Sequence, residues 1–179
     1  MNFSVQKSIV FLVLSFFLFS FGFQQKNPKN EYPNPVLVKT QVVDASAKET
    51  WKVVAQFDNL AELTPNFLHS VKIKGKIGEG CERTCTSPDQ KSFYKEKVTH
   101  FNKKEMYYRY ALTEGSIPVK NMDNSFRVIP LGKTQSLIVW TTSYDYVENP
   151  NMSKEKLAGF MNAAITEMLT NINITTSKS

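Results

Sequence analysis

Arg83 and Glu96 are the charged residues whose predicted placement best supports chemistry. Residues 81–86 and 93–101 have the composition of antiparallel strands, and residues 87–90 (Ser-Pro-Asp-Gln) supply the turn between them. A turn centred between Asp89 and Gln90 places Arg83 directly opposite Glu96, with both side chains on the same face of the hairpin. Such a pair can anchor the polar end of a ligand, or it can be an internal salt bridge that fixes strand register.

Lysines on the second strand predict that this face is the inner one. Lys95 and Lys97 alternate with Tyr94, Glu96 and Val98, so lysines in water turn the other three side chains inward. An isolated charge in an apolar interior is very costly. The two inward charges must therefore pair with each other or serve a ligand, and both interpretations stay open.

Alternation on three later strands adds more side chains to the inner face. Residues 106–113, 122–130 and 137–147 have strand composition, and charged residues such as Arg109 and Asp123 are expected to face water. On the last strand one face carries four side chains, and the pattern does not decide which way that face points. The predicted inward residues are Tyr108, Tyr110, Leu112, Met122, Asn124, Phe126 and Val128, and the last strand's set is Trp140, Thr142, Tyr144 and Tyr146.

The chain closes with a predicted amphipathic helix. Apolar residues recur at steps of three and four from Leu157 to Ile172. A long helix that follows a run of hairpins is expected to pack across the sheet, and a curved sheet would leave a cavity beneath it. The stripe consists of Leu157, Phe160, Met161, Ala164, Ile165, Met168, Leu169 and Ile172.

The remaining elements precede the hairpin. Residues 36–44 are predicted to form a strand, Ser46 and Glu49 a capping box that starts a helix, and residues 60–63 a second short helix. A further strand is expected at residues 71–76. The element order is therefore that of an α+β domain, in which two short helices follow the first strand and a long helix ends the chain.

The N-terminal residues 1–23 are predicted to be a signal peptide. Lys7 is their only charge, and the apolar run at residues 9–23 is short for a membrane span and suited to a signal core. This predicts export, to the periplasm or as a secreted protein. An uncleaved segment that anchors the protein in the membrane is the alternative.

Length and composition predict a single domain that follows a short flexible segment. Residues 24–35 are polar and proline-rich and read as a flexible leader. The domain is expected at residues 36–172, with residues 173–179 a disordered tail.

The net charge of +6 is a modest excess, and the pattern of basic residues predicts no nucleic-acid partner. The densest basic cluster consists of Lys95, Lys97, Lys103 and Lys104, and it lacks the arginine-rich, aromatic-interleaved pattern of a nucleic-acid groove. Weak contact with an anionic membrane surface is an alternative role for these lysines.

The sequence predicts no metal and no cofactor. Cys81 and Cys85 are four residues apart on one strand, roughly 13 Å, whereas a disulfide needs less than about 7 Å. Both are expected to be free, buried thiols. A zinc site built from these cysteines and His100 lacks the close ligand spacing of known sites, and His69 and His100 are expected at the surface.

Several strings, taken in order, resemble the polyketide cyclase/dehydrase and lipid-transport superfamily, the START-like helix-grip (SRPBCC) group. They are residues 47–57 with Trp51, 78–83 (GEGCER), 94–96 (YKE), 115–118 (GSIP), 139–141 (VWT) and the closing helix. The resemblance implies a seven-stranded antiparallel sheet that grips the C-terminal helix around an apolar cavity. It also implies that the polar pocket residues are Arg83 and Glu96, and that residues 87–91 and 114–118 form the entrance.

Together these observations favour a binding or carrier domain for a small hydrophobic or amphipathic ligand, either lipid-like or polyketide-like. Arg83 and Glu96 would orient the polar end of the ligand. The alternative is a cyclase or dehydratase type of enzyme that uses Glu96 as acid or base on a hydrophobic substrate. The other residues predicted to contact the ligand are Tyr94, Tyr108, Tyr110, Phe126, Trp140, Met161, Ala164, Ile165 and Met168.

Overall fold

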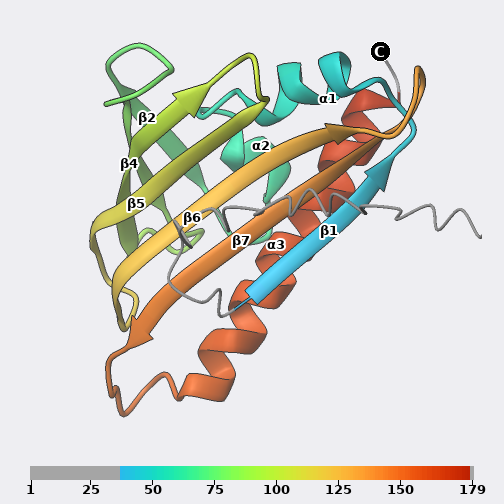
Figure 1. Ribbon diagram of the computed structural model, residues 1–179. Helices are drawn as coiled ribbons and strands as arrows, with labels where there is room; N and C mark the ends of the chain where they lie inside the picture. Colours follow the sequence, from blue (N-terminus) through green and yellow to red (C-terminus); the bar gives the residue numbers. More distant parts are fainter. Residues whose placement is uncertain (1–36, 178–179) are drawn as a thin grey trace, which may run out of the picture. The chain divides into compact units, whose positions relative to one another are not determined.

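Seven antiparallel strands form one curved sheet in the computed structural model, which describes residues 37–177 (Figure 1). The strand order is β1-β7-β6-β5-β4-β3-β2, so every pair of neighbours except β1 and β7 is consecutive in the chain. The strands are β1 (Leu37–Val43), β2 (Ser70–Lys74), β3 (Glu82–Thr86), β4 (Phe93–Asn102), β5 (Tyr107–Gly115), β6 (Val119–Pro130) and β7 (Ser136–Tyr146). The predicted signal peptide and leader lie outside the described residues.

Three helices pack on one face of this sheet. They are α1 (Ala47–Val54), α2 (Leu60–Leu63) and α3 (Lys154–Thr176). The predicted capping box is confirmed, since the Ser46 hydroxyl accepts from the backbone N–H of Glu49 while the Glu49 carboxylate accepts from the backbone of Ser46. Among residues 37–177, no helix combines the length and the hydropathy that a membrane crossing requires.

The last helix extends beyond the predicted domain end at Ile172. It continues to Thr176, whose side chain is buried and whose hydroxyl donates to the Ile172 carbonyl over 2.8 Å. The first four residues of the predicted tail are therefore helical rather than disordered, because the last turn still has a side chain to bury.

The predicted hairpin register is confirmed. Arg83 is the cross-strand partner of Glu96, and Cys85 is the partner of Tyr94. The alternation on β4 holds through Val98, where a bulge shifts the register and leaves His100 exposed. The bulge explains why this histidine does not continue the inward row.

The closing helix lies across the sheet beside β1, and it also contacts α1 and α2 (Figure 1). Its buried residues follow the predicted stripe: Leu157, Met161, Met168, Leu169 and Ile172. Ala164 and Ile165 are half-buried, and Phe160 is 41% exposed. The middle turns of α3, around Phe160, Ala164 and Ile165, are therefore less closely covered than its two ends.

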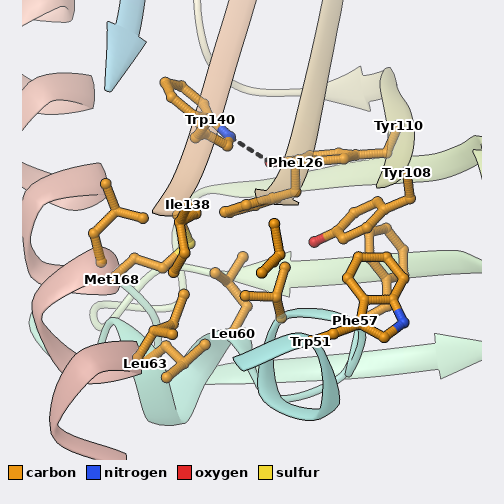
Figure 2. Packing of buried hydrophobic residues seen from close by; sticks show 14 of the residues in the cluster. Trp51, Phe57, Leu60, Leu63, Tyr108, Tyr110, Phe126, Ile138, Trp140 and Met168 are labelled. Atoms are coloured by element: carbon orange, nitrogen blue, oxygen red, sulfur yellow. Dashed lines mark hydrogen bonds between the residues drawn. The ribbon is translucent and has the colours of Figure 1, made fainter. Parts of the chain in front are cut away.

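A cluster of aromatic rings fills the space near α1 (Figure 2). Tyr108 stacks on Phe126 with ring centres 5.4 Å apart, and Phe57 meets Tyr110 edge-on at 5.7 Å. Trp51 of α1 packs against Tyr108 at 6.1 Å. This part of the interior is a packed core without room for a ligand.

Candidate functional site

A cavity of about 90 Å³ lies between the sheet and α3. Since about 10–15 Å³ by this measure holds one water, the cavity has room for roughly six to nine waters. Its walls come from α2, the segment that follows α2, strands β3 to β7, and α3. The lining residues are Leu60, Thr64, Phe67, Leu68, Arg83, Tyr94, Glu96, Tyr110, Ile117, Met122, Asn124, Trp140, Phe160, Met161, Ala164, Ile165 and Met168.

Most of the side chains that the sequence predicted to contact a ligand line this cavity. Two do not: Tyr108 and Phe126 lie in the aromatic cluster near α1 instead. Strand alternation correctly predicted that they point inward. It could not predict how far along the strand α1 covers the sheet, and that coverage places them in the packed core. The predicted residues around the cavity are Arg83, Tyr94, Glu96, Tyr110, Trp140, Met161, Ala164, Ile165 and Met168.

Sequence reasoning missed one wall of the cavity. Leu60, Thr64, Phe67 and Leu68 belong to α2 and the segment after it, which carries no periodic signal. Phe67 meets the exposed Phe160 ring edge-on at 5.3 Å, at the outer side of this wall. Of the two predicted entrance loops, the second contributes Ile117 to the lining, and residues 87–91 contribute no lining side chain.

The two charged residues of the cavity form a buried ion pair. Arg83 Nε donates to a Glu96 carboxylate oxygen over 2.6 Å, and both residues are 4% exposed. Arg83 Nη1 also donates to the Phe57 carbonyl over 3.2 Å. Its guanidinium lies over the Phe57 ring at 4.0 Å and near the Tyr110 ring at 4.9 Å. The guanidinium is therefore held by the protein itself.

Burial and pairing act in opposite directions on this pair. Burial raises the pKa of Glu96, and the Arg83 guanidinium partly offsets that rise. Burial alone would lower the pKa of Arg83, but the Glu96 carboxylate and nearby polar groups outweigh it, so the pKa stays well above its usual value. With Arg83 a cation and Glu96 a carboxylate at 2.6 Å, the pair as a whole carries no net charge into the cavity.

The sequence matches a known protein family over most of its length. Residues 35–173 match the family described as polyketide cyclase/dehydrase and lipid transport. The chain belongs to this family. Comparison with curated protein sequences finds no match.

Solved structures with the same fold come from bacteria and a plant. XoxI from Bacillus cereus is 21% identical with a TM-score of 0.67, and the alignment covers 78% of this chain and 93% of that one. Norcoclaurine synthase from Thalictrum flavum, in complex with dopamine and hydroxybenzaldehyde, is 21% identical with a TM-score of 0.65, covering 79% and 86%. The Zhui aromatase/cyclase from Streptomyces is 15% identical with a TM-score of 0.69, covering 79% and 93%. These likenesses confirm the helix-grip fold.

In this family member two aromatic side chains of the cavity wall, Trp140 and Tyr110, form a hydrogen bond with each other. Trp140 Nε1 donates to the Tyr110 hydroxyl over 3.1 Å, drawn as a dashed line in Figure 2. Burial raises the pKa of Tyr110 and raises that of Tyr94 well above its usual value, so both phenols stay neutral.

The described residues offer no metal centre. Between residues 37 and 177, no group of three or more His, Cys, Asp and Glu side chains is placed to hold an ion. His69 and His100 are exposed, and His100 packs on Tyr107 at 5.6 Å, outside the cavity lining.

The prediction of two free, buried cysteines is confirmed. Burial raises the pKa of Cys85 from its usual 9.0 to about 12, and it also raises the pKa of Cys81. The shift at Cys85 corresponds to about a thousandfold smaller thiolate fraction near pH 8. We expect the native protein to resist a thiol reagent such as DTNB, and both cysteines to react at once in denaturant. Rapid native labelling of either thiol would contradict this burial.

Proposed function

We propose that the protein binds a small, uncharged, largely apolar molecule in the cavity between the sheet and α3. The observation that carries this proposal is the lining itself. It is mostly aliphatic and aromatic, and among the described lining residues the only charged side chains, Arg83 and Glu96, neutralise each other over 2.6 Å. The norcoclaurine synthase structure of the same fold, which is a complex with dopamine and hydroxybenzaldehyde, supports a small aromatic ligand.

The size of the cavity favours a small molecule over a two-chain lipid. An apolar cavity of about 150 Å³ holds one benzene molecule, so the space here suits a ligand of one ring, and a larger one must displace lining side chains. Met161 and Met168 can change rotamer around such a ligand, which favours some breadth in the shapes accepted. A single ring system or a short chain fits this description.

The electrostatics of the cavity favour a neutral ligand over a fatty-acid anion. An anion would have to be desolvated, and the Arg83 cation is already paired with Glu96 and bonded to the Phe57 carbonyl. The role that the sequence suggested for this pair, anchoring the ligand's polar end, thus has less support than a structural role. Export of the protein remains a prediction from residues 1–23.

Acid–base catalysis by Glu96 is the second candidate function. Its carboxyl lies on the cavity wall, and burial raises its pKa toward the range in which an acid catalyst works. Proton transfer from or to Glu96 would, however, have to proceed against its 2.6 Å bond to Arg83. We therefore place binding first.

Methionine methyl groups provide a direct test of binding. Met122, Met161 and Met168 line the cavity, whereas Met106 and Met152 do not. In protein labelled with ¹³C at the methionine methyls, titration with naphthalene should shift the resonances of the three lining residues and leave the other two unchanged. Naphthalene is apolar and uncharged, and the flexible Met161 and Met168 side chains must move to admit its two rings. Equal movement of the signals from these five methionines, or of none, would contradict the proposed site.

A further inference from the structure

We propose that Asn124, together with Thr142, recognises an uncharged ligand group that presents a hydrogen-bond donor and an acceptor side by side, such as a carboxamide or an undissociated carboxylic acid. This inference rests on the proposed function and deepens it. The group that anchors the polar part of the ligand is then the neutral amide of Asn124 on β6, and not the Arg83–Glu96 pair on β3 and β4.

Asn124 is an unsatisfied polar residue in the cavity wall. It is 1% exposed, it lines the cavity, and among residues 37–177 neither Oδ1 nor Nδ2 has a hydrogen-bond partner. Thr142 is its cross-strand partner on β7, is also 1% exposed, and has a hydroxyl without a partner. Two adjacent inward side chains therefore leave their hydrogen-bonding atoms unused.

Leaving these atoms unpaired is energetically expensive. A buried donor or acceptor without a partner costs about 1–3 kcal/mol, whereas an apolar side chain of the same shape avoids that cost. Asn124 sits between Met122 and Phe126 in the inward row of β6, where leucine would suit the core. A ligand group that supplies the missing donor and acceptor would remove this cost, and a group that cannot supply them would bind less well.

The other polar groups of the cavity have partners within the protein. Arg83 and Glu96 bond to each other, and the Tyr110 hydroxyl accepts from Trp140. Among the described lining residues, Asn124 therefore offers the unpaired donor and acceptor, and its cross-strand neighbour Thr142, which is not itself a lining residue, adds an unpaired hydroxyl. A carboxamide side chain donates from nitrogen and accepts at oxygen, so its complement is a group with one acceptor and one donor at matching spacing. A carboxylate lacks the donor and would set its charge against the Asn124 oxygen.

Three matched probes test the inference: naphthalene, 2-naphthamide and 2-naphthoate. In the wild-type protein at neutral pH, titrations followed by the methionine methyls should show 2-naphthamide binding at least about tenfold more tightly than naphthalene. 2-Naphthoate should bind more weakly than 2-naphthamide. In Asn124→Leu the preference for the amide should disappear, while naphthalene binds as well as before or better.

Two further variants complete the design. Thr142→Val keeps the shape of the side chain and should reduce the amide preference in part, which covers the case in which Asn124→Leu does not fold. Asn162→Leu replaces an exposed asparagine on α3 and should change nothing.

The inference and the proposed function fail in different ways. If naphthalene binds and 2-naphthamide binds no better, or if Asn124→Leu and Thr142→Val both retain the full preference, the role of Asn124 is wrong while the cavity remains a binding site. If no probe binds, both are wrong.

Discussion

Replacing Arg83 by methionine is expected to destabilise the protein by about 3–5 kcal/mol, the range seen when one partner of a buried ion pair is removed. The guanidinium is the near neighbour of the Glu96 carboxylate at 2.6 Å, and both groups are almost wholly buried. Methionine matches the length of the aliphatic part of arginine but leaves Glu96 buried without a compensating charge. The change should appear as a lower midpoint in urea unfolding with the same dependence on denaturant.

The destabilisation should also depend on pH. Burial raises the pKa of Glu96 in the folded state, and without Arg83 nothing on the described lining opposes that rise. Below the ordinary carboxyl pKa the folded and unfolded states are both protonated, so the penalty is smallest there. As the pH rises above the ordinary carboxyl pKa, the unfolded state loses its proton first, so the Arg83→Met variant should become progressively less stable until the folded state also ionises.

Two companion variants separate the pair from its packing. In the double variant Arg83→Met with Glu96→Leu, much of the lost stability should return, because an apolar pair needs no compensating charge. Lys74→Met serves as the control for an exposed pair, since the Lys74–Glu82 pair at 3.2 Å lies in water and should contribute little to stability. A double variant as unstable as Arg83→Met alone would show that packing of the guanidinium on Phe57, not charge, is what matters.

Replacing Ala164 by phenylalanine is expected to abolish measurable binding of naphthalene while the protein stays folded. Ala164 is a small, half-buried residue of α3 whose side chain faces the cavity. A phenyl ring added there occupies space comparable to one ring of the ligand. We expect an affinity loss of more than about tenfold, which corresponds to about 1.4 kcal/mol. Overpacking by the added ring should lower the unfolding free energy by about 1–3 kcal/mol.

The adjacent residue provides the control for this experiment. Ala163 is exposed on the same turn of α3, so Ala163→Phe makes the same chemical change outside the cavity. It should leave the shifts of Met161 and Met168 on titration unchanged. Binding that survives Ala164→Phe at full strength would place the ligand elsewhere.

Much of the site could be predicted from local pattern. The turn at residues 87–90 and the lysines at 95 and 97 were sufficient to predict that Arg83 faces Glu96 inside the sheet, and the structure confirms it. The stripe on α3 likewise predicted the helix that covers the sheet. Both follow from short-range geometry, because strand alternation and helical periodicity fix which side of an element is apolar.

Only the tertiary structure decided what those inward side chains do. It separates Tyr108 and Phe126, packed under α1, from Tyr110 and Trp140, which line the cavity. It also shows that Arg83 is already held by Glu96 and the Phe57 carbonyl, whereas Asn124 has no partner. The sequence determines the face of each strand because that depends on neighbouring residues alone. Cavity position and hydrogen-bond satisfaction depend on where helices distant in the chain come to rest on the sheet, and no local pattern encodes that.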